Sequence, residues 1–309
     1  MSIAFITHRA CLLHDMGAHH PEQPARLSAI EDQLIASGLI NHLHQADASR
    51  ATREQLERVH EASYLDAIEE AAPSNGIVHL DPDTAMCPHT LDAALHAAGA
   101  AVLATDMVMA GEAGSAFCSV RPPGHHAERA RAMGFCLFNN VAVAAAHALE
   151  HHGLERVAIV DFDVHHGNGT EEIFTGDRRV LMVSTFQHPF YPYSGTEGRS
   201  EQMINIPLAA YSGGREFRAA VEQYWMPALE AFKPQMILIS AGFDAHREDD
   251  MAMLSFVEAD YAWVTEKLVG VAEKHAQGRI VSMLEGGYSL SALGRSVVAH
   301  LRALGGLDA

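Results

Sequence analysis

The feature that most constrains the fold is a repeated alternation of short apolar runs with longer, alanine-rich helical patterns. The apolar runs are rich in β-branched residues and lie at 115–120, 157–160, 180–184, 236–240 and 279–283; the helical patterns lie at 91–109, 139–152, 214–232 and 257–276. Strands that are apolar throughout are buried on both faces, and their alternation with helices is typical of a helix-covered parallel sheet. We therefore predict one α/β domain over residues 1–309, a three-layer sandwich around a mainly parallel sheet.

The charge balance argues against nucleic acid as a partner. The chain has 21 Lys and Arg residues against 39 Asp and Glu residues, a net charge of −18. Nucleic-acid binding requires a basic face, which this composition does not favour. An acidic surface is compatible with a cationic substrate, although solubility alone explains most such surfaces.

The remaining composition favours a cytoplasmic protein. The four cysteines, Cys11, Cys87, Cys118 and Cys136, form no CxxC pair, which is typical of reduced thiols. The N-terminus turns polar too early for a signal peptide, and we find no continuous apolar run of the length that crosses a membrane. We therefore expect a cytoplasmic location and no membrane contact. The 21 histidines invite a search for metal or proton chemistry.

Ionisable or glycine-rich loops follow four of the predicted strands. The loops are RPPGHH (121–126), DFDVHHGNG (161–169), AGFD (241–244) and LEGGY (284–288). Parallel strands place their carboxyl ends at one edge of the sheet, where ligands of such folds bind. We therefore predict an active site along this edge.

Three residues at these strand ends fit a catalytic metal. Asp163 and His165 are two positions apart, and residues i and i+2 of an extended segment point the same way. Asp244, after a neighbouring strand, completes the set. One imidazole and two carboxylates leave an open coordination position, as catalytic zinc requires.

The same loops offer proton carriers and an oxyanion donor. His125 and His126 lie on a glycine loop, and Asp161 and Asn168 on the next loop are suited to orient them. Tyr288 follows two glycines, so its phenol is placed to donate to a developing oxyanion. Tandem histidines alone carry little information, and we interpret the pair 151–152 as a helix end.

At these motifs the sequence resembles the zinc-dependent histone deacetylase family, including bacterial deacetylases and acetylpolyamine amidohydrolases. The matching stretches are HPEQPARL (20–27), RPPGHHA (121–127), GFCLFNN (134–140), DFDVHHGNGTEEIF (161–174), SAGFDAH (240–246) and EGGYS (285–289). Asn168 stands where class I members have aspartate, so the chain is more similar to class II. The resemblance implies the arginase-like α/β sandwich and an amidohydrolase that removes acyl groups from lysine side chains.

The resemblance also implies a role for each matching residue. It implies one zinc ion on Asp163, His165 and Asp244, with His126 as general base and acid, His125 beside it, Asp161 and Asn168 as their partners, and Tyr288 as oxyanion donor. Gly134, Phe135 and Gly286 match substrate-binding positions, and the second aromatic wall of the acyl-lysine tunnel falls on Tyr191 or Phe190. A potassium site is implied near Asp161, Asp163, His165, Ser184 and Thr185.

The sequence leaves the substrate open. The leading hypothesis is an acetylated lysine in a protein or peptide, and the alternative is an N-acetylated polyamine. Asp83, with Asp81, and the acidic loop 246–251 are candidates for holding a substrate backbone or a second ammonium group, or are solvated loops. A catalytically silent acyl-ligand sensor and an arginase-like ureohydrolase with two manganese ions are remote alternatives. The oligomeric state stays open.

Overall fold

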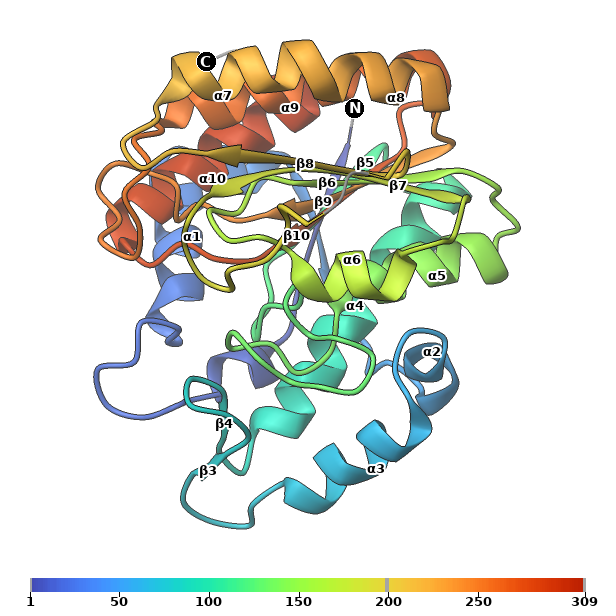
Figure 1. Ribbon diagram of the computed structural model, residues 1–309. Helices are drawn as coiled ribbons and strands as arrows, with labels where there is room; N and C mark the ends of the chain where they lie inside the picture. The colour runs from blue at the N-terminus through green and yellow to red at the C-terminus, as the bar shows by residue number, and fades with distance from the viewer. Residues whose placement is uncertain (1, 198–199, 308–309) are drawn as a thin grey trace.

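A computed structural model of the chain describes residues 2–197 and 200–307, and its centre is a twisted sheet of eight parallel strands (Figure 1). The strand order is β2-β1-β5-β10-β9-β6-β7-β8. The bounds are β1 Ile3–Thr7, β2 Leu43–Asp47, β5 Ser115–Cys118, β6 Val157–Asp161, β7 Val180–Gln187, β8 Met203–Leu208, β9 Met236–Ala241 and β10 Ile280–Leu284. Two short antiparallel strands, β3 Val78–His79 and β4 Ala85–Met86, pair outside this sheet.

Helices cover both faces of the sheet. On one face α4 Thr90–Ala110 and α5 Asn140–Glu150 pack on the central strands, with α6 Asn168–Phe174 beside them (Figure 1). On the other face lie α9 Glu258–His275 and α10 Leu290–Gly305, with α1 Ala25–Ala36 packed on α10. One continuous helical segment completes that layer. It consists of α7 Gly214–Ala220, the π-helical turn Val221–Trp225 and α8 Met226–Phe232. The short helices α2 Arg53–Glu57 and α3 Ala62–Ala71 lie at the periphery, and single 3-10 turns span Arg9–Leu12 and Leu39–His42.

The predicted three-layer α/β sandwich is confirmed. All five predicted strands and all four predicted helical segments are present, with ends that differ by a few residues. The prediction missed β1, β2 and β8 in the sheet and α1 and α10 among the long helices. β2 and β8 are the edge strands, and their partly exposed residues lack the continuous apolar pattern of the central strands.

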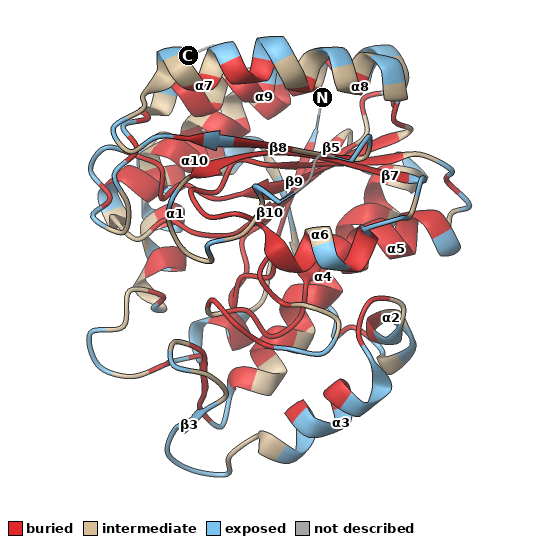
Figure 2. Cartoon of the chain, viewed as in Figure 1, coloured by how far each residue is buried: buried red, intermediate tan, exposed pale blue. Residues whose placement is uncertain are grey.

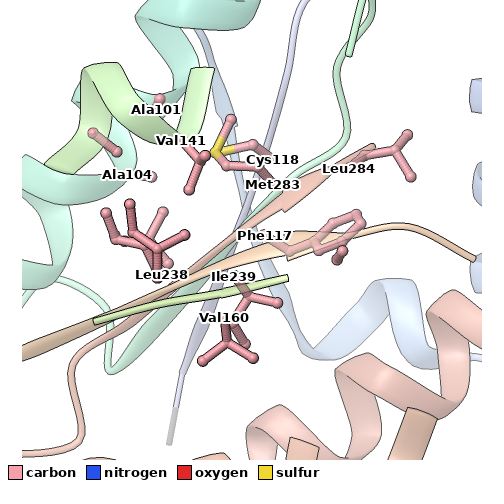
Figure 3. Packing of buried hydrophobic residues seen from close by; sticks show 14 of the residues in the cluster. Ala101, Ala104, Phe117, Cys118, Val141, Val160, Leu238, Ile239, Met283 and Leu284 are labelled. Atoms are coloured by element: carbon pink, nitrogen blue, oxygen red, sulfur yellow. The ribbon is translucent and has the colours of Figure 1, made fainter. Parts of the chain in front are cut away.

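Buried side chains from the sheet and both helical layers form one hydrophobic cluster (Figure 2). Figure 3 shows how small residues of α4, such as Ala101 and Ala104, lie near strand residues such as Leu238 and Cys118. By length and composition α4 could cross a membrane, although its apolar residues do not form one continuous run. However, 72% of its most apolar window is buried inside the protein, as in a core helix.

Candidate active site

The four predicted loops meet at the carboxyl edge of the sheet. β10 lies between β5 and β9, and β9 lies between β10 and β6, so the loops that follow these four strands are neighbours. The register keeps the strand ends level, because Asp161 is paired with Ser240 and Ser240 with Met283. Chain segments more than 100 residues apart in sequence therefore contribute to one site.

The loop after β6 differs from the expected extended segment. Residues 163–165 form a bend. Asp161 and Asp163 each accept a hydrogen bond from the backbone N–H two residues ahead. Asp161 Oδ1 accepts from Asp163 N at 3.1 Å, and Asp163 Oδ1 accepts from His165 N at 2.9 Å. The short distance between Asp163 and His165 therefore comes from these consecutive turns, and the explanation from strand alternation is wrong.

Asp163, His165 and Asp244 gather into one buried cluster. Their ligand atoms all lie within 4.8 Å of one another, and all three residues are buried. Asp244 Oδ1 accepts from Val164 N, whereas Oδ2 has no hydrogen-bond donor among the described residues, with His165 Nδ1 at 3.3 Å. Gly286 N donates to Asp163 Oδ2 at 2.9 Å, and a Cβ at residue 286 would lie 2.0 Å from Asp244 Oδ2. Two carboxylates, one of them with a buried unpaired oxygen, and one imidazole fit a zinc ion.

The electrostatics of this cluster call for a positive charge. Burial together with the negative charge of Asp163 raises the pKa of Asp244 to about 6. Burial alone would lower the pKa of His165, but the carboxylates of Asp163 and Asp244 raise it to about 9. The two buried carboxylates thus favour a neighbouring cation, either a proton on His165 or a metal ion in its place.

The tandem histidines have the predicted partners. His125 Nδ1 lies 3.0 Å from Asp161 Oδ2, and His126 Nδ1 lies 2.7 Å from Asn168 Oδ1. Burial opposes a charge on His125, but Asp161 and Asp163 raise its pKa to about 10. Burial and the neighbouring His125 and His165 lower the pKa of His126 well below its usual value. Because Asn168 Oδ1 only accepts, the His126 proton is assigned to Nδ1, which leaves Nε2 as a base.

Glu285 lies buried under the histidine loop, and the sequence interpretation gave it no role of its own. Its Oε2 accepts from Gly124 N and His125 N at 2.7 and 3.1 Å, and its Oε1 accepts from Ser240 Oγ at 3.0 Å. Burial raises the pKa of Glu285 to about 7. Glu285 therefore ties the loop after β5 to the ends of β9 and β10.

Tyr288 is held by two residues that sequence reasoning missed. Asp249 Oδ2 accepts from Tyr288 N at 2.6 Å and from Ser289 N at 2.9 Å. The Arg26 guanidinium lies 5.0 Å from the centroid of the Tyr288 ring and donates from Nε to Gly287 O. Burial raises the pKa of Tyr288 well above its usual value, so the phenol keeps its proton.

A cavity with aromatic walls leads to the cluster. Its lining includes all six predicted substrate-binding residues, Asp83, Gly134, Phe135, Phe190, Tyr191 and Gly286, and it reaches His125, His126, His165 and Tyr288. Phe190 and Tyr191 both contribute: Phe190 stacks on His165 at 5.4 Å between ring centroids, and Tyr191 stands edge-on to His126 at 5.3 Å. Phe135 stands edge-on to Tyr288 at 5.9 Å.

The acidic residues at the rim mostly have partners within the protein. Asp83 Oδ1 accepts from Gly134 N at 3.2 Å, and Asp81 Oδ1 accepts from Asp83 N at 2.9 Å. In the loop 246–251, Asp249 is buried and Glu248 pairs with Arg295 at 2.9 Å. Met251 is the residue that this loop contributes to the cavity lining.

Two of the five residues of the implied potassium site, Ser184 and Thr185, lie on β7, whereas Asp161 ends β6 and Asp163 and His165 follow it. Ser184 pairs with Asp161 across β6 and β7. The hydroxyls of Ser184 and Thr185 are buried without a hydrogen-bond partner in the described part of the chain. The potassium ion stays a prediction.

The fold and the site define a parallel α/β protein with a buried Asp–His–Asp cluster below an aromatic cavity, bordered by a histidine pair and a tyrosine. The histone deacetylase domain matches residues 20–304, and the chain belongs to this family. A probable deacetylase of Archaeoglobus fulgidus is 37% identical over 100% of this chain and 88% of its own length. A histone deacetylase-like amidohydrolase of Pseudomonas aeruginosa is 37% identical over 93% of this chain and 81% of its own length. The crystal structure of the HDA15 HD domain superposes with a TM-score of 0.93 at 34% identity, covering 99% of this chain and 90% of that one.

Proposed function

We propose that this protein is a zinc-dependent deacetylase that hydrolyses the amide of acetylated lysine side chains in proteins or peptides. Family membership supports a deacetylase, and the observation that carries the proposal is the position of His126. The contact of its Nδ1 with Asn168 leaves Nε2 unprotonated, and His126 lines the same cavity as His165 of the Asp–His–Asp cluster. Zinc and cytoplasmic location are parts of this proposal.

Each residue of the site has a step in the proposed reaction. A zinc ion held by Asp163, His165 and Asp244 would supply a Lewis acid that acidifies water and polarises the acyl carbonyl. His126 takes the water proton as that oxygen bonds to the acyl carbon. His126 then gives the proton to the amine nitrogen as the C–N bond breaks, and acetic acid and the free amine leave. Tyr288 donates its phenol proton in a hydrogen bond to the carbonyl oxygen while negative charge develops there.

The charge of His125 fits a supporting role. Because Asp161 and Asp163 keep it protonated, it is not the group that accepts the water proton. Its positively charged ring lies beside the His126 ring, with 4.1 Å between the two ring centroids. That charge keeps His126 unprotonated before the attack.

The walls of the cavity favour a long apolar chain that ends in the amide. Phe135, Phe190 and Tyr191 offer ring faces and edges to the methylene groups of a lysine side chain. A polyamine has a second ammonium group that needs an acidic partner at the mouth. Oδ1 of Asp81 accepts from Asp83 N, and Oδ1 of Asp83 accepts from Gly134 N on a different loop, so both carboxylates already hold backbone donors and we rank the polyamine second.

The test is kcat/KM of the zinc-loaded protein for an acetyl-lysine peptide and for N-acetylated polyamines, measured side by side. We expect the peptide to be preferred by tenfold or more. The reverse preference would show that acetylated polyamines are the substrate, with the same amide hydrolysis. Tyr288→Phe is the matched control, because it keeps the ring contacts and removes the donor. It should retain zinc and lose roughly 10²–10³ in kcat. Full activity of this variant would exclude the assigned role of Tyr288.

A further inference from the structure

A second group of metal-ligating side chains lies at the end of α5, away from the site described above. Asp106 comes from α4, His147 from the last turns of α5, and His151 and His152 from the residues directly after it. The ligand atoms of all four lie within 4.8 Å of one another. We propose that these residues form a second metal site, which takes a divalent transition ion such as Zn²⁺.

The helix geometry brings the imidazoles together. His147 and His151 are four positions apart, so they share one face of the helix end, and their rings stack at 4.7 Å with an interplanar angle of 11°. His152 contacts both, at centroid distances of 5.2 and 4.9 Å. His151, the C-cap of α5, confirms the predicted helix end, where the helix dipole favours a cation.

Asp106 already bridges two of the imidazoles. Nε2 of His147 and Nε2 of His152 each lie 2.7 Å from Asp106 Oδ1. Tetrahedral zinc with bonds of roughly 2.0–2.1 Å separates its ligand atoms by about 3.4 Å, inside the range spanned by this cluster. His147 is buried, whereas His151 is exposed and the other two are partly exposed, so the outer ligands can adjust and an ion can enter from solvent. Three imidazoles and one carboxylate suit zinc and its neighbours in the transition series.

One neighbour opposes the ion and thereby provides a test. Arg58 Nη1 lies 3.0 Å from His147 Nδ1, and a guanidinium only donates, so the His147 proton is assigned to Nε2. A metal bound at Nε2 moves that proton to Nδ1, and the contact with Arg58 must then break. Partners of ligating histidines are normally acceptors, which Arg58 is not.

The second site is separate from the proposed catalytic centre. α5 starts beside the histidine loop, where Asn140 Nδ2 donates to Pro122 O. His151 follows eleven residues later, about 16 Å along the helix at roughly 1.5 Å per residue. Paired catalytic metals stand only about 3.5–4 Å apart. The second ion would therefore clamp α4 to the end of α5, and it does not rest on the proposed function.

The experiment counts zinc per chain after equilibrium dialysis of the full-length protein against micromolar Zn²⁺. The variants are His151→Ala/His152→Ala and, as a control, His44→Ala, which removes an exposed histidine of β2. The double variant should hold one zinc ion fewer per chain than the wild type and the control. Equal zinc content in all three would overturn the site, whatever the catalytic centre binds.

A second measurement tests the ligand assignment. The Co²⁺ absorption spectrum of the wild type minus that of the double variant should show the visible bands of a tetrahedral nitrogen and oxygen site. Arg58→Gln replaces the guanidinium with a side chain that has an acceptor oxygen, and it should tighten zinc at this site by roughly tenfold. Absent bands, or weaker zinc binding in Arg58→Gln, would overturn the assignment of His147.

Discussion

Asp249 offers the strongest test of how the fold positions the tyrosine. The residue is 5% exposed, and its Oδ2 accepts from two backbone donors, Tyr288 N at 2.6 Å and Ser289 N at 2.9 Å. Asp249→Ala leaves both N–H groups without this partner. An unsatisfied buried donor costs about 1–3 kcal/mol. Tyr288 and Ser289 are only half-buried, so water replaces part of the loss, and we expect the free energy of unfolding to fall by about 1–3 kcal/mol in total. Asp249→Asn keeps an acceptor oxygen and should lose less.

The effect on activity should act through Tyr288. With the loop released, the phenol no longer stays at the position of the oxyanion, and kcat should fall by up to the roughly 10²–10³ assigned to that donor. KM should change less, because Phe135, Phe190 and Tyr191 remain in the cavity wall. The assay is a double-mutant cycle of Asp249→Ala and Tyr288→Phe, with kcat measured well below the unfolding temperature of every variant.

The cycle gives a clear refutation. If Asp249 only positions Tyr288, adding Asp249→Ala to Tyr288→Phe should lower kcat by no more than about twofold. If instead Asp249→Ala lowers kcat by the same factor with and without the Tyr288 hydroxyl, Asp249 acts independently of that hydroxyl, and our explanation is wrong.

Three further predictions test other parts of the site and fold. Asp244→Ala should abolish both zinc retention at the buried cluster and activity; a variant that keeps this zinc would contradict the ligand assignment. Gly134→Ala should keep zinc but lower kcat at least tenfold, because its Cβ would lie 2.3 Å from the His126 ring at a backbone φ of +56°; unchanged kcat would show that the ring shifts without cost. Burial lowers the pKa of His60 from 6.5 to about 4, so between these values the unfolded chain binds a proton that the folded chain does not. Stability should therefore fall as the pH drops through this window, by about 3 kcal/mol over its full width. Urea unfolding at pH 7 and pH 4.5 should show a smaller difference for His60→Gln than for the wild type or His44→Gln, and an equal difference would contradict the burial argument.

The sequence predicts the central part of the fold because burial on both faces leaves a continuous apolar run. The runs that became β6, β9 and β10 carry that signature, and every residue in these strands is buried. The edge strand β2 has the pattern LHQAD, with its polar residues exposed, and resembles a loop. Residues 3–7 form a strand that is also apolar and mostly buried, but no helical pattern directly follows it in the sequence.

The candidate site was predictable where its chemistry sits directly at strand ends. Asp163, His125 and Tyr288 belong to loops whose side chains themselves carry the signal. Asp249 and Glu285 act on backbone N–H groups 39 and up to 161 residues away, and a sequence pattern does not reveal such contacts. The cluster around His147 depends on two helices packing side by side, which brings Asp106 to a histidine 41 residues away.

The most direct test of the central claim is a zinc titration of the metal-free protein that follows acetate release from an acetyl-lysine peptide. The titration uses the His151→Ala/His152→Ala variant, so that the buried Asp–His–Asp cluster is the site that fills. We predict no activity without zinc, a linear rise with added zinc and a plateau at one ion per chain. Full activity of the metal-free protein, or a plateau reached only at two ions per chain, would contradict a single catalytic zinc at this site.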